Sequence, residues 1–423
     1  MSVSTDPDAP PRWRRRALEV FETPAYRRYF AGLVCVMSGF WVRIAALPWL
    51  VYEMTGSKDA LGEIAAASLL PWIVISPFSG VLADRVDPRR LLQLVYATVV
   101  LANVGLGVAL LDGQVGYSFL LAWTILTGVL RGVENPTRHL LVRHVVGLER
   151  LPNAIGMNAA GFHLTNATGF ALAGWLYAQL GPAGCFFVVA ALTIPMVVIA
   201  GTMPHVERDP DAPPRRNAWI ELREGFAYVL HEPLLRRVIA STFTLVLVVL
   251  SWRTVAPALV KDDLGLDERG YGVVMAMAGV GSLLAALWVA GHASDRAGRA
   301  RRLGRLALAA GLAVLGLSFS RWPALTGVAV LVAGFCQVGY MATANTVVQE
   351  TVPDVLRGRV MGIWALMFGA AYPIGGWLLA ALAERTSTSN ALMTFGIAGV
   401  VGALLAAAYA LRVRRRQAER ATA

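Results

Sequence analysis

Twelve long apolar runs separated by short polar loops constrain this chain more than any other feature. A helix needs about 20 mainly apolar residues to cross roughly 30 Å of hydrocarbon. Hydrophobic residues make up 56% of the 423 residues and charged residues only 15%, so a water-soluble fold would leave large apolar patches exposed. The sequence therefore predicts an all-α membrane protein with spans near residues 29–52, 61–82, 91–111, 117–139, 153–180, 184–203, 235–260, 270–291, 304–320, 324–349, 358–383 and 390–411.

The basic residues predict how the spans are oriented. An even number of spans places both termini on one side, and that side collects most of the Lys and Arg residues, including Arg12, Arg14 to Arg16, Arg27, Arg28, Arg412, Arg414 to Arg416 and Arg420. The opposite loops hold only Lys58, Lys261, Arg269, Arg321 and Arg385. Because short basic loops stay cytoplasmic, both termini are expected in the cytoplasm. Contacts between these loops and anionic lipid headgroups account for the net charge of +11 without nucleic acid.

One long hydrophilic segment follows the sixth span and divides the chain into similar halves. The expected organisation is a tail at 1–28, a six-helix bundle at 29–203, a linker at 204–234, a second bundle at 235–411 and a tail at 412–423. Within the linker, Trp219, Leu222, Phe226 and Val229 recur at helical spacing. This spacing predicts an amphipathic helix on the cytoplasmic membrane surface.

A charged loop signature occurs twice, each time between two apolar runs. The first copy runs from Gly80 to Arg90 and the second from Gly291 to Arg301. Other features repeat at nearly the same offset: Arg43, Pro48 and Gly56 recur as Arg253, Pro257 and Gly265, and Gly174-Trp175-Leu176 recurs as Gly376-Trp377-Leu378. Matches in this order predict two parallel six-helix repeats related by an axis along the membrane normal.

With these residues in place, the chain resembles a major facilitator superfamily transporter over all twelve spans. The duplicated loop is similar to the superfamily motif G-x-L-a-D-r-x-G-r-r. Further phrases resemble the branch of bacterial siderophore and macrolide exporters, and they are Ala46 to Tyr52, Thr55-Gly56-Ser57, Leu151 to Ile155, Leu222 to Gly225 and Arg357 to Met361. The resemblance implies alternating access around a midplane cavity that is lined by the first, fourth, seventh and tenth spans.

The chain also departs from the pattern. The first loop has Asp87 and Pro88 where the motif has glycine and arginine, and the second has Ala300 in place of an arginine. Span five lacks the Gly-Pro pair typical of antiporters in this superfamily, and the arginine often found near Thr124 is missing. Proton antiport therefore lacks two of its usual sequence supports.

Arginines within the spans are the strongest candidates for a substrate site, because a guanidinium in hydrocarbon is costly and normally faces a cavity or a partner. Arg43 and Arg253 lie at similar depth in opposite halves, and the resemblance places both near the translocation path. They either bind an anionic or carbonyl-rich substrate or pair structurally across the bundle.

Other polar residues inside the spans are further candidates. Arg131 and Glu134 in span four, with Arg138, are more typical of a structural ion-pair network than of a coupling carboxylate. His163 in span five suits a proton relay or a packing role. Gln337 and Asn345 in span ten are expected to line the cavity.

The two loops are predicted to act as gates. Asp84 ends span two, where it can accept hydrogen bonds from the amino end of a neighbouring helix in one access state. The gating residues are Gly80, Asp84, Arg85, Arg89 and Arg90 in the first loop and Gly291, Asp295, Arg296, Gly298 and Arg299 in the second. Helix capping and topology alone are the alternative role.

Taken together, these features predict a monomeric secondary transporter, not an enzyme, which exports a bulky amphipathic compound such as a drug or siderophore-like metabolite. A phosphate-binding G-x-x-x-x-G-K-[ST] loop is absent, so protons are the expected energy source. No cofactor is expected, and Cys35, Cys185 and Cys336, all within spans, predict neither disulfide nor metal site. Uptake or flipping of an anionic solute or lipid, and a non-transporting sensor or scaffold, are the alternatives.

Overall fold

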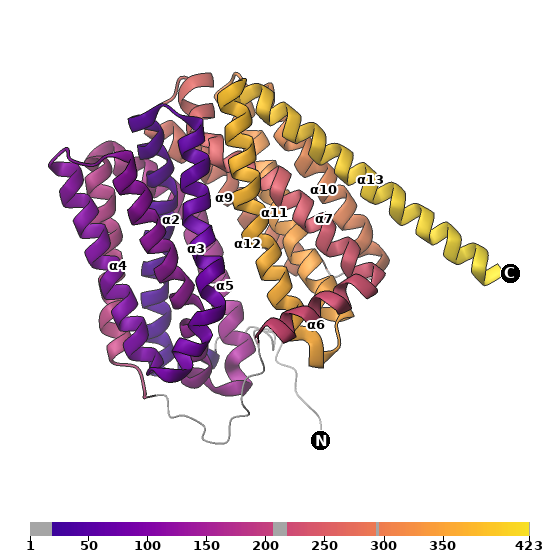
Figure 1. Cartoon of the computed structure of the whole chain (residues 1–423), viewed down its shortest axis with the longest axis horizontal. Helices are drawn as coiled ribbons and strands as arrows, with labels where there is room; N and C mark the ends of the chain where they lie inside the picture. Colours follow the sequence, from indigo (N-terminus) through magenta and orange to yellow (C-terminus); the bar gives the residue numbers. More distant parts are fainter. Residues whose placement is uncertain (1–18, 206–217, 293–295, 423) are drawn as a thin grey trace, which may run out of the picture.

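The computed structural model describes residues 19–205, 218–292 and 296–422, and within these ranges the chain is helical with no strand. Figure 1 shows the helices as two adjacent groups, one from each half of the sequence. The elements of the first half are η1(Val20–Glu22), α2(Pro24–Thr55), α3(Lys58–Arg85), α4(Pro88–Leu111) and α5(Tyr117–Gly201). Those that follow are α6(Ala218–His231), α7(Pro233–Val249), η2(Leu250–Val255), α8(Ala256–Ala258), η3(Leu259–Asp263), α9(Glu268–Gly291), α10(Arg296–Ser318), α11(Pro323–Thr351), α12(Asp354–Arg385) and α13(Thr388–Thr422).

Helix α5 consists of three rods rather than one. Gly147 and Gly181 have φ of 74° and 67°, outside the helical region, and glycine adopts such angles without steric cost. The chain reverses at each of them, so α5 supplies the fourth, fifth and sixth crossings. With α7 to η3 counted as one crossing, the described residues form twelve rods. Eight helical stretches meet both the length and the hydropathy expected of a membrane span.

The seventh crossing is a distorted helix. It passes from α7 through the 3₁₀ segment η2 into the π segment η3. Pro257 lies in this region, and proline lacks the N–H that a regular helix needs. Arg253 stands within η2, so the predicted site residue of the second half lies where the helical ladder changes its pitch.

The two halves are in contact at the end of the molecule where α2 ends and α3 begins, and in Figure 1 the rods diverge from there toward the opposite end, where η1 lies and α13 finishes (the terminal side). A Cβ atom at Gly272 of α9 would lie 2.7 Å from the Cα of Gly174, in the fifth rod. The equivalent glycine of α3, Gly62, packs in the same way against Trp377 and Ala380 of α12. Each half thus uses a glycine in its second rod to approach the fifth rod of the other half.

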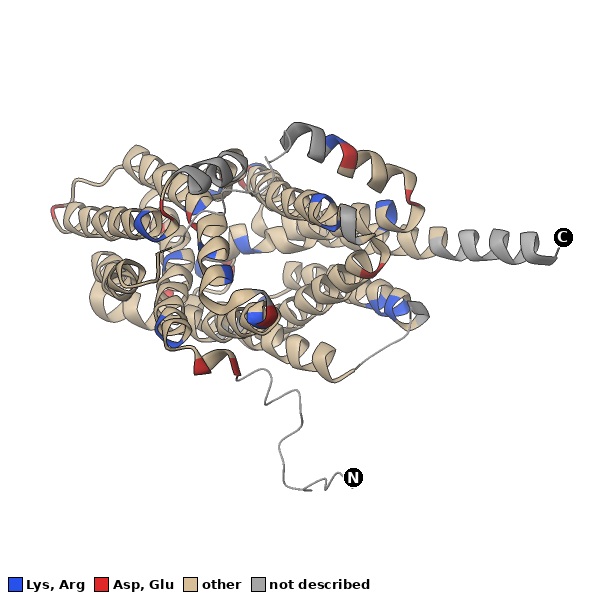
Figure 2. Ribbon diagram, turned by 90° about the horizontal axis from the view of Figure 1, so that it is seen from below, with Lys and Arg blue, Asp and Glu red and all other residues tan. Residues whose placement is uncertain are grey.

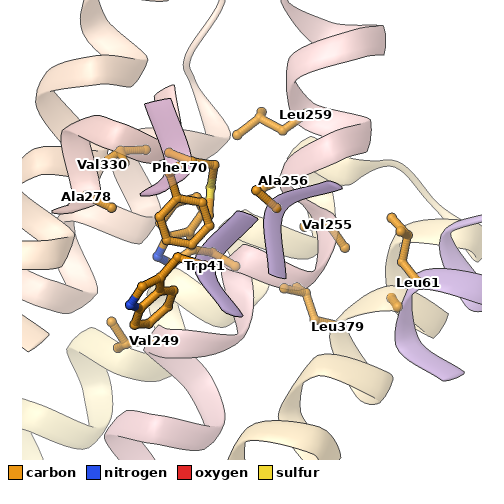
Figure 3. Packing of buried hydrophobic residues seen from close by; sticks show 14 of the residues in the cluster. Trp41, Leu61, Phe170, Val249, Val255, Ala256, Leu259, Ala278, Val330 and Leu379 are labelled. Atoms are coloured by element: carbon orange, nitrogen blue, oxygen red, sulfur yellow. The ribbon is translucent and has the colours of Figure 1, made fainter. Parts of the chain in front are cut away.

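The apolar core continues across this contact. In Figure 3, Trp41, Leu61 and Phe170 from the first half lie among residues of the second half such as Val255 and Leu379. The rings of Trp41 and Phe170 are 5.4 Å apart. The stacked pair of Trp49 in α2 and Tyr271 in α9 crosses the same boundary, with ring centroids 5.1 Å apart. The Trp41–Phe170 contact lies within the first half, and the Trp49–Tyr271 stack joins the two halves on the side opposite the terminal side.

The helix of the predicted linker, α6, packs on the second half. Glu224 of α6 pairs with Arg359 of α12, and a Cβ at Gly225 would meet Cβ of Arg359 at 3.2 Å. Val229 is buried, whereas Phe226 and Leu230 on the same helix are exposed. Two phrases that resemble the exporter branch, Leu222 to Gly225 and Arg357 to Met361, are therefore joined by an ion pair at the terminal side.

Candidate substrate cavity

A cavity opens among four rods of the first half. Its volume is about 50 Å³, whereas small-molecule sites commonly hold about 300–1,000 Å³, so it has room for one small group of a ligand rather than for a whole drug-sized compound. Arg43, Arg131 and Glu134, all predicted site residues, line it together. The remaining lining residues are Val36, Phe40, Tyr96, Val99, Asn103, Thr127, Val189 and Thr193.

Two arginines that line this cavity contact the same aromatic ring. The guanidinium of Arg131 lies 3.8 Å from the centroid of Phe40, and that of Arg43 lies 5.6 Å from the same centroid. Arg43 also donates a hydrogen bond of 2.8 Å to Oγ1 of Thr127. No described carboxylate forms an ion pair with either guanidinium. Cation–π contact stabilises both charges but does not neutralise them.

The carboxylate of Glu134 is already engaged. It accepts hydrogen bonds from the hydroxyl of Tyr96 at 3.0 Å and from Arg138 at 3.3 Å. Arg138 also donates to Oδ1 of Asn135 at 2.7 Å. Glu134 and Arg138 are four residues apart on one helix, the spacing at which side chains meet. The ion pair neutralises Arg138 and leaves the charges of Arg43 and Arg131 in excess.

The arginine of the second half repeats the arrangement with fewer partners. Arg253 donates to Oε1 of Gln337 at 3.4 Å, and both this bond and the one from Arg43 to Thr127 join residues 84 positions apart. The guanidinium lies 6.0 Å from the ring centroid of Phe170 in the first half. Its buried Nε finds no hydrogen-bond acceptor among the described residues. Each half thus presents an arginine from its first rod to a polar residue on its fourth.

Other predicted site residues lie elsewhere. Oδ1 of Asn345 accepts a hydrogen bond of 3.2 Å from Gln349 on its own helix, and Gln337, Asn345 and Arg253 are not among the residues that line the cavity of the first half. His163 belongs to α5, but its side chain lies outside the described residues.

Sequence reasoning did not single out several residues of this cavity. Phe40 precedes Arg43 by three positions and so lies on the same helix face; that spacing was the available signal. Asn103 and Thr193 are buried polar residues in otherwise apolar spans. Close to Thr124, where the superfamily arginine is missing, Arg43 donates to Thr127, whose hydroxyl in turn donates to the carbonyl oxygen of Thr124 at 3.1 Å.

The first predicted gate is described only in part. Gly80, Asp84 and Arg85 belong to α3, but their side chains lie outside the described residues. Asp87 caps α4 by accepting from the backbone N–H of Arg89 at 3.1 Å, and Pro88 occupies the first turn. The departures from the loop motif are therefore a helix-start signal, because proline suits the first turn and aspartate the cap. Arg90, the remaining residue of this group, is exposed.

A small charge cluster surrounds Asp87. Arg89 donates from Nε to the carboxylate at 2.6 Å and from a terminal nitrogen to the carbonyl oxygen of Met203 at 3.4 Å. His205 lies 3.0 Å from the same carboxylate. Burial raises the pKa of Asp87, but the hydrogen bonds from Arg89 and His205 outweigh it and hold that pKa below its usual value. The cluster ties the start of the third rod to the end of the sixth.

In the second loop, Asp295 lies outside the described residues, as does the side chain of Arg296. Gly291 is the last residue of α9, and Gly298 lies in the first turns of α10. Arg299 of α10 pairs with Glu350 of α11. The described part of the chain contains no cluster of three metal-ligating side chains.

Comparison with known proteins identifies the family. The profile of a family described as transmembrane secretion effector matches residues 17–423. The chain belongs to this family. The chain is similar to the staphyloferrin A transporter of Staphylococcus aureus, to which it is 23% identical over 381 residues covering 88% of this chain and 92% of that protein. The multidrug efflux pump Tap of Mycolicibacterium fortuitum is 26% identical over 356 residues, with 82% and 86% covered. An enterobactin exporter of Salmonella choleraesuis is 24% identical over 392 residues, with 90% and 91% covered.

Solved structures show the same architecture for this transmembrane secretion effector. A POT family transporter in complex with 5-aminolevulinic acid aligns with a TM-score of 0.73 at 13% identity, covering 92% of this chain and 97% of that one. A D-xylose–proton symporter aligns with a TM-score of 0.65 at 17% identity, covering 91% and 97%. The fold is therefore that of a major facilitator superfamily transporter with two pseudo-symmetric six-helix bundles, and the predicted fold class and family are confirmed. The chain is a membrane transporter and not an enzyme.

Proposed function

We propose that this transporter is a proton-driven exporter of a bulky amphipathic organic compound in the bacterial cytoplasmic membrane. The observation that carries the proposal is the family match along nearly the whole chain, with relatives whose names denote siderophore export and drug efflux. The cavity beside Arg43 and Arg131 supplies room for part of such a compound. Small-molecule substrate, protons and membrane lipids are its partners in this proposal, and a monomer is the working unit.

The packing of the halves gives the proposal a mechanism. With Gly62 packed against Trp377 and Ala380, and Gly272 packed against Gly174, the molecule is held shut on the side opposite the terminal side. If the termini are cytoplasmic, this arrangement receives substrate from the cytoplasm. Export then requires the glycine contacts to separate while contacts form on the terminal side, which is alternating access by movement of one repeat against the other.

Transport in vesicles of known sidedness tests the function. Inverted membrane vesicles with an imposed inward-acid pH gradient should accumulate at least one amphipathic dye from a panel that includes the anion carboxyfluorescein and a cationic rhodamine methyl ester, and collapsing the gradient should release it. Vesicles that contain the Asp84→Asn protein should accumulate the dye more slowly, with Asp295→Asn milder, if the first loop is the principal gate. Accumulation only in right-side-out vesicles would identify an importer, and none of several dyes moving in either orientation would contradict transport of amphipathic compounds.

A topology assay tests the orientation on which this mechanism depends. The asymmetry of Lys and Arg supports a cytoplasmic location for both termini. A reporter active only in the cytoplasm should therefore work when fused after Ala423 and fail when inserted beside Lys58. The reverse pattern would exchange the two sides and with them the direction assigned to the closed face.

A further inference from the structure

We infer that the cavity of the first half is an organic-anion site, which holds a carboxylate of the transported compound between Arg43 and Arg131. The inference rests on the proposed function and adds the chemical class of the substrate. It places a charged subsite inside one bundle, formed by α2, α4 and two rods of α5, rather than on the seam between the halves.

Charge balance inside the cavity is the first step. Three guanidiniums lie in this region, those of Arg43, Arg131 and Arg138, and the cavity wall contributes a single carboxylate, Glu134. That carboxylate is paired with Arg138 and also accepts from Tyr96. Two positive charges therefore remain at membrane depth without a described counter-ion. Uncompensated charge of this kind is expensive in a bilayer, so it marks a place where a ligand supplies the missing charge.

The geometry of the two arginines is the second step. Both contact the ring of Phe40, whose centroid is 3.8 Å from the guanidinium carbon of Arg131 and 5.6 Å from that of Arg43, so one aromatic side chain helps to position both. Thr127 anchors Arg43 with one hydrogen bond, which leaves further N–H groups of its guanidinium for a ligand. Arginine offers a planar fork that matches a carboxylate with two parallel hydrogen bonds. Two such forks held by one ring form a site for an anion and would repel a cation.

The hydroxyl groups of the cavity point to the same class of ligand. Thr127 donates to the carbonyl oxygen of Thr124, and Thr193 donates to that of Val189. Tyr96 donates to Glu134. Asn103 donates one amide N–H to the carbonyl oxygen of Val99 and keeps a second, so the charged donors that remain for a ligand are those of the arginines. The apolar lining of Val36, Val99 and Val189 suits the hydrocarbon part of an amphipathic acid.

Equilibrium binding with two dyes tests the charge preference. Carboxyfluorescein and a rhodamine methyl ester share a xanthene ring system, but the first is an anion and the second a cation. The purified full-length protein should bind carboxyfluorescein more tightly, and citrate should compete with it while triethyl citrate should not. Equal affinity for the two dyes, or equal competition by citrate and its neutral ester, would overturn the inference. This comparison uses only the unaltered protein, so it stands even if the variants fold poorly.

Variants then assign the site. Arg43→Gln and Arg131→Gln should each weaken carboxyfluorescein binding about tenfold or more, since each removes a charge-assisted hydrogen bond to the ligand. Arg131→Lys should retain more affinity than Arg131→Gln because it keeps the charge. Arg385→Gln, at an exposed arginine at the end of α12, is the matched control and should bind as the unaltered protein does. Monodisperse Arg43→Gln and Arg131→Gln proteins with unchanged affinity would contradict the assignment.

Two further experiments ask whether a lipid headgroup occupies the site and whether anion binding and transport depend on each other. The affinity for carboxyfluorescein should be the same in nanodiscs of phosphatidylglycerol and in nanodiscs of phosphatidylcholine. Displacement of the dye by phosphatidylglycerol would show that a lipid headgroup occupies the site, and it would overturn the substrate site. Vesicle transport gives the second experiment. Gradient-driven transport of the rhodamine ester without any anion binding would support the exporter proposal and contradict the anion site. Anion binding without transport of either dye would support the anion site and contradict the exporter proposal.

Discussion

Gly272 and Gly174 lie so close that a Cβ atom on either would be 2.7 Å from the Cα of the other. Gly272 also approaches the carbonyl oxygen of Phe170 at 3.2 Å, measured from the same Cβ position. Real side chains essentially never fit at such distances, so the two rods can meet here only as glycines. The contact joins the second rod of one half to the fifth rod of the other, and its counterpart at Gly62 does the same with the halves exchanged.

Replacing one of these glycines should open this face. Gly272→Leu cannot be accommodated beside Gly174 without separating the rods, so the protein should spend more time in states that are open opposite the termini. The expected result is faster labelling of a cysteine introduced at Ala46, which lines a small pocket beside Gly174, by a membrane-impermeant maleimide added from that side. Gly105→Leu is the matched control, since a Cβ at Gly105 meets nothing within 4 Å. Equal labelling of both variants would mean that the glycine contact does not hold the face shut.

The charge cluster at Asp87 predicts a pH dependence of stability. Hydrogen bonds from Arg89 and His205 hold the pKa of Asp87 below its unfolded value of about 4. A lowered folded pKa means that the stabilisation is fully present above the unfolded pKa and is lost as the pH falls through the folded pKa. The melting temperature of the unaltered protein should therefore exceed that of Asp87→Asn at pH values above about 5, and the difference should shrink as the pH falls below about 4.

The choice of asparagine isolates the charge in that experiment. Asparagine caps a helix about as well as aspartate does. Asp87→Ala should lower the free energy of unfolding by about 0.5–2 kcal/mol more at every pH, because the cap itself is gone. Thermal unfolding of the three proteins in detergent across the pH range measures both effects. A difference between the unaltered protein and Asp87→Asn that stays constant down to the acid limit would contradict the ion-pair origin of the lowered pKa.

Breaking the Glu134–Arg138 pair from one side should destabilise the fold. Glu134→Gln leaves Arg138 as an uncompensated charge inside the bundle, which should cost about 3–5 kcal/mol of stability. Glu134→Gln combined with Arg138→Gln removes both charges and should recover much of the loss, since the remaining amides can still bond to Tyr96 and Asn135. Melting temperatures of the single and double variants, read as a double-mutant cycle, measure the coupling. Additive losses in the double variant would show that the pair contributes no net interaction.

The sequence predicted much of this fold because each crossing depends on local properties. Apolar length located the spans, and the repeats from Arg43 to Gly56 and from Arg253 to Gly265 predicted the two halves. Gly56 and Gly265 each come just after the first rod of their half, and each has a φ of 62°. Hydropathy could not predict the change to 3₁₀ and π geometry around Arg253, because it reports the side chains and not the hydrogen-bond ladder. Hydropathy also did not indicate that Gly62 and Gly272, each in the second rod of its half, would approach the fifth rod of the other half.

The site was predicted as residues but not as an arrangement. Arg43, Arg131 and Glu134 were recognisable because charges inside apolar spans are few. That they share one cavity depends on how the first and fourth rods turn toward each other, which no local pattern specifies. Phe40 illustrates this limit, because an aromatic residue in a membrane span is ordinary and only the packing brings two guanidiniums to its ring.

The last prediction concerns Arg253, the counterpart of Arg43 in the second half. Its guanidinium has one hydrogen bond, to Gln337, and lies near the ring of Phe170 from the first half. Since no described carboxylate pairs with it, Arg253→Gln breaks no ion pair and should leave the melting temperature nearly unchanged. If Arg253 contacts substrate when the halves move, dye transport should fall about tenfold, the worth of one charge-assisted hydrogen bond.

Arg253→Lys distinguishes two kinds of contact, because lysine preserves the charge and loses the planar fork. Transport restored by lysine would indicate attraction to the net charge of the substrate, and transport lost in both stable variants would indicate a directional bond to a carboxylate or carbonyl group. A marked drop in melting temperature for Arg253→Gln would instead identify Arg253 as a packing residue, and normal transport by a stable variant would remove it from the translocation path.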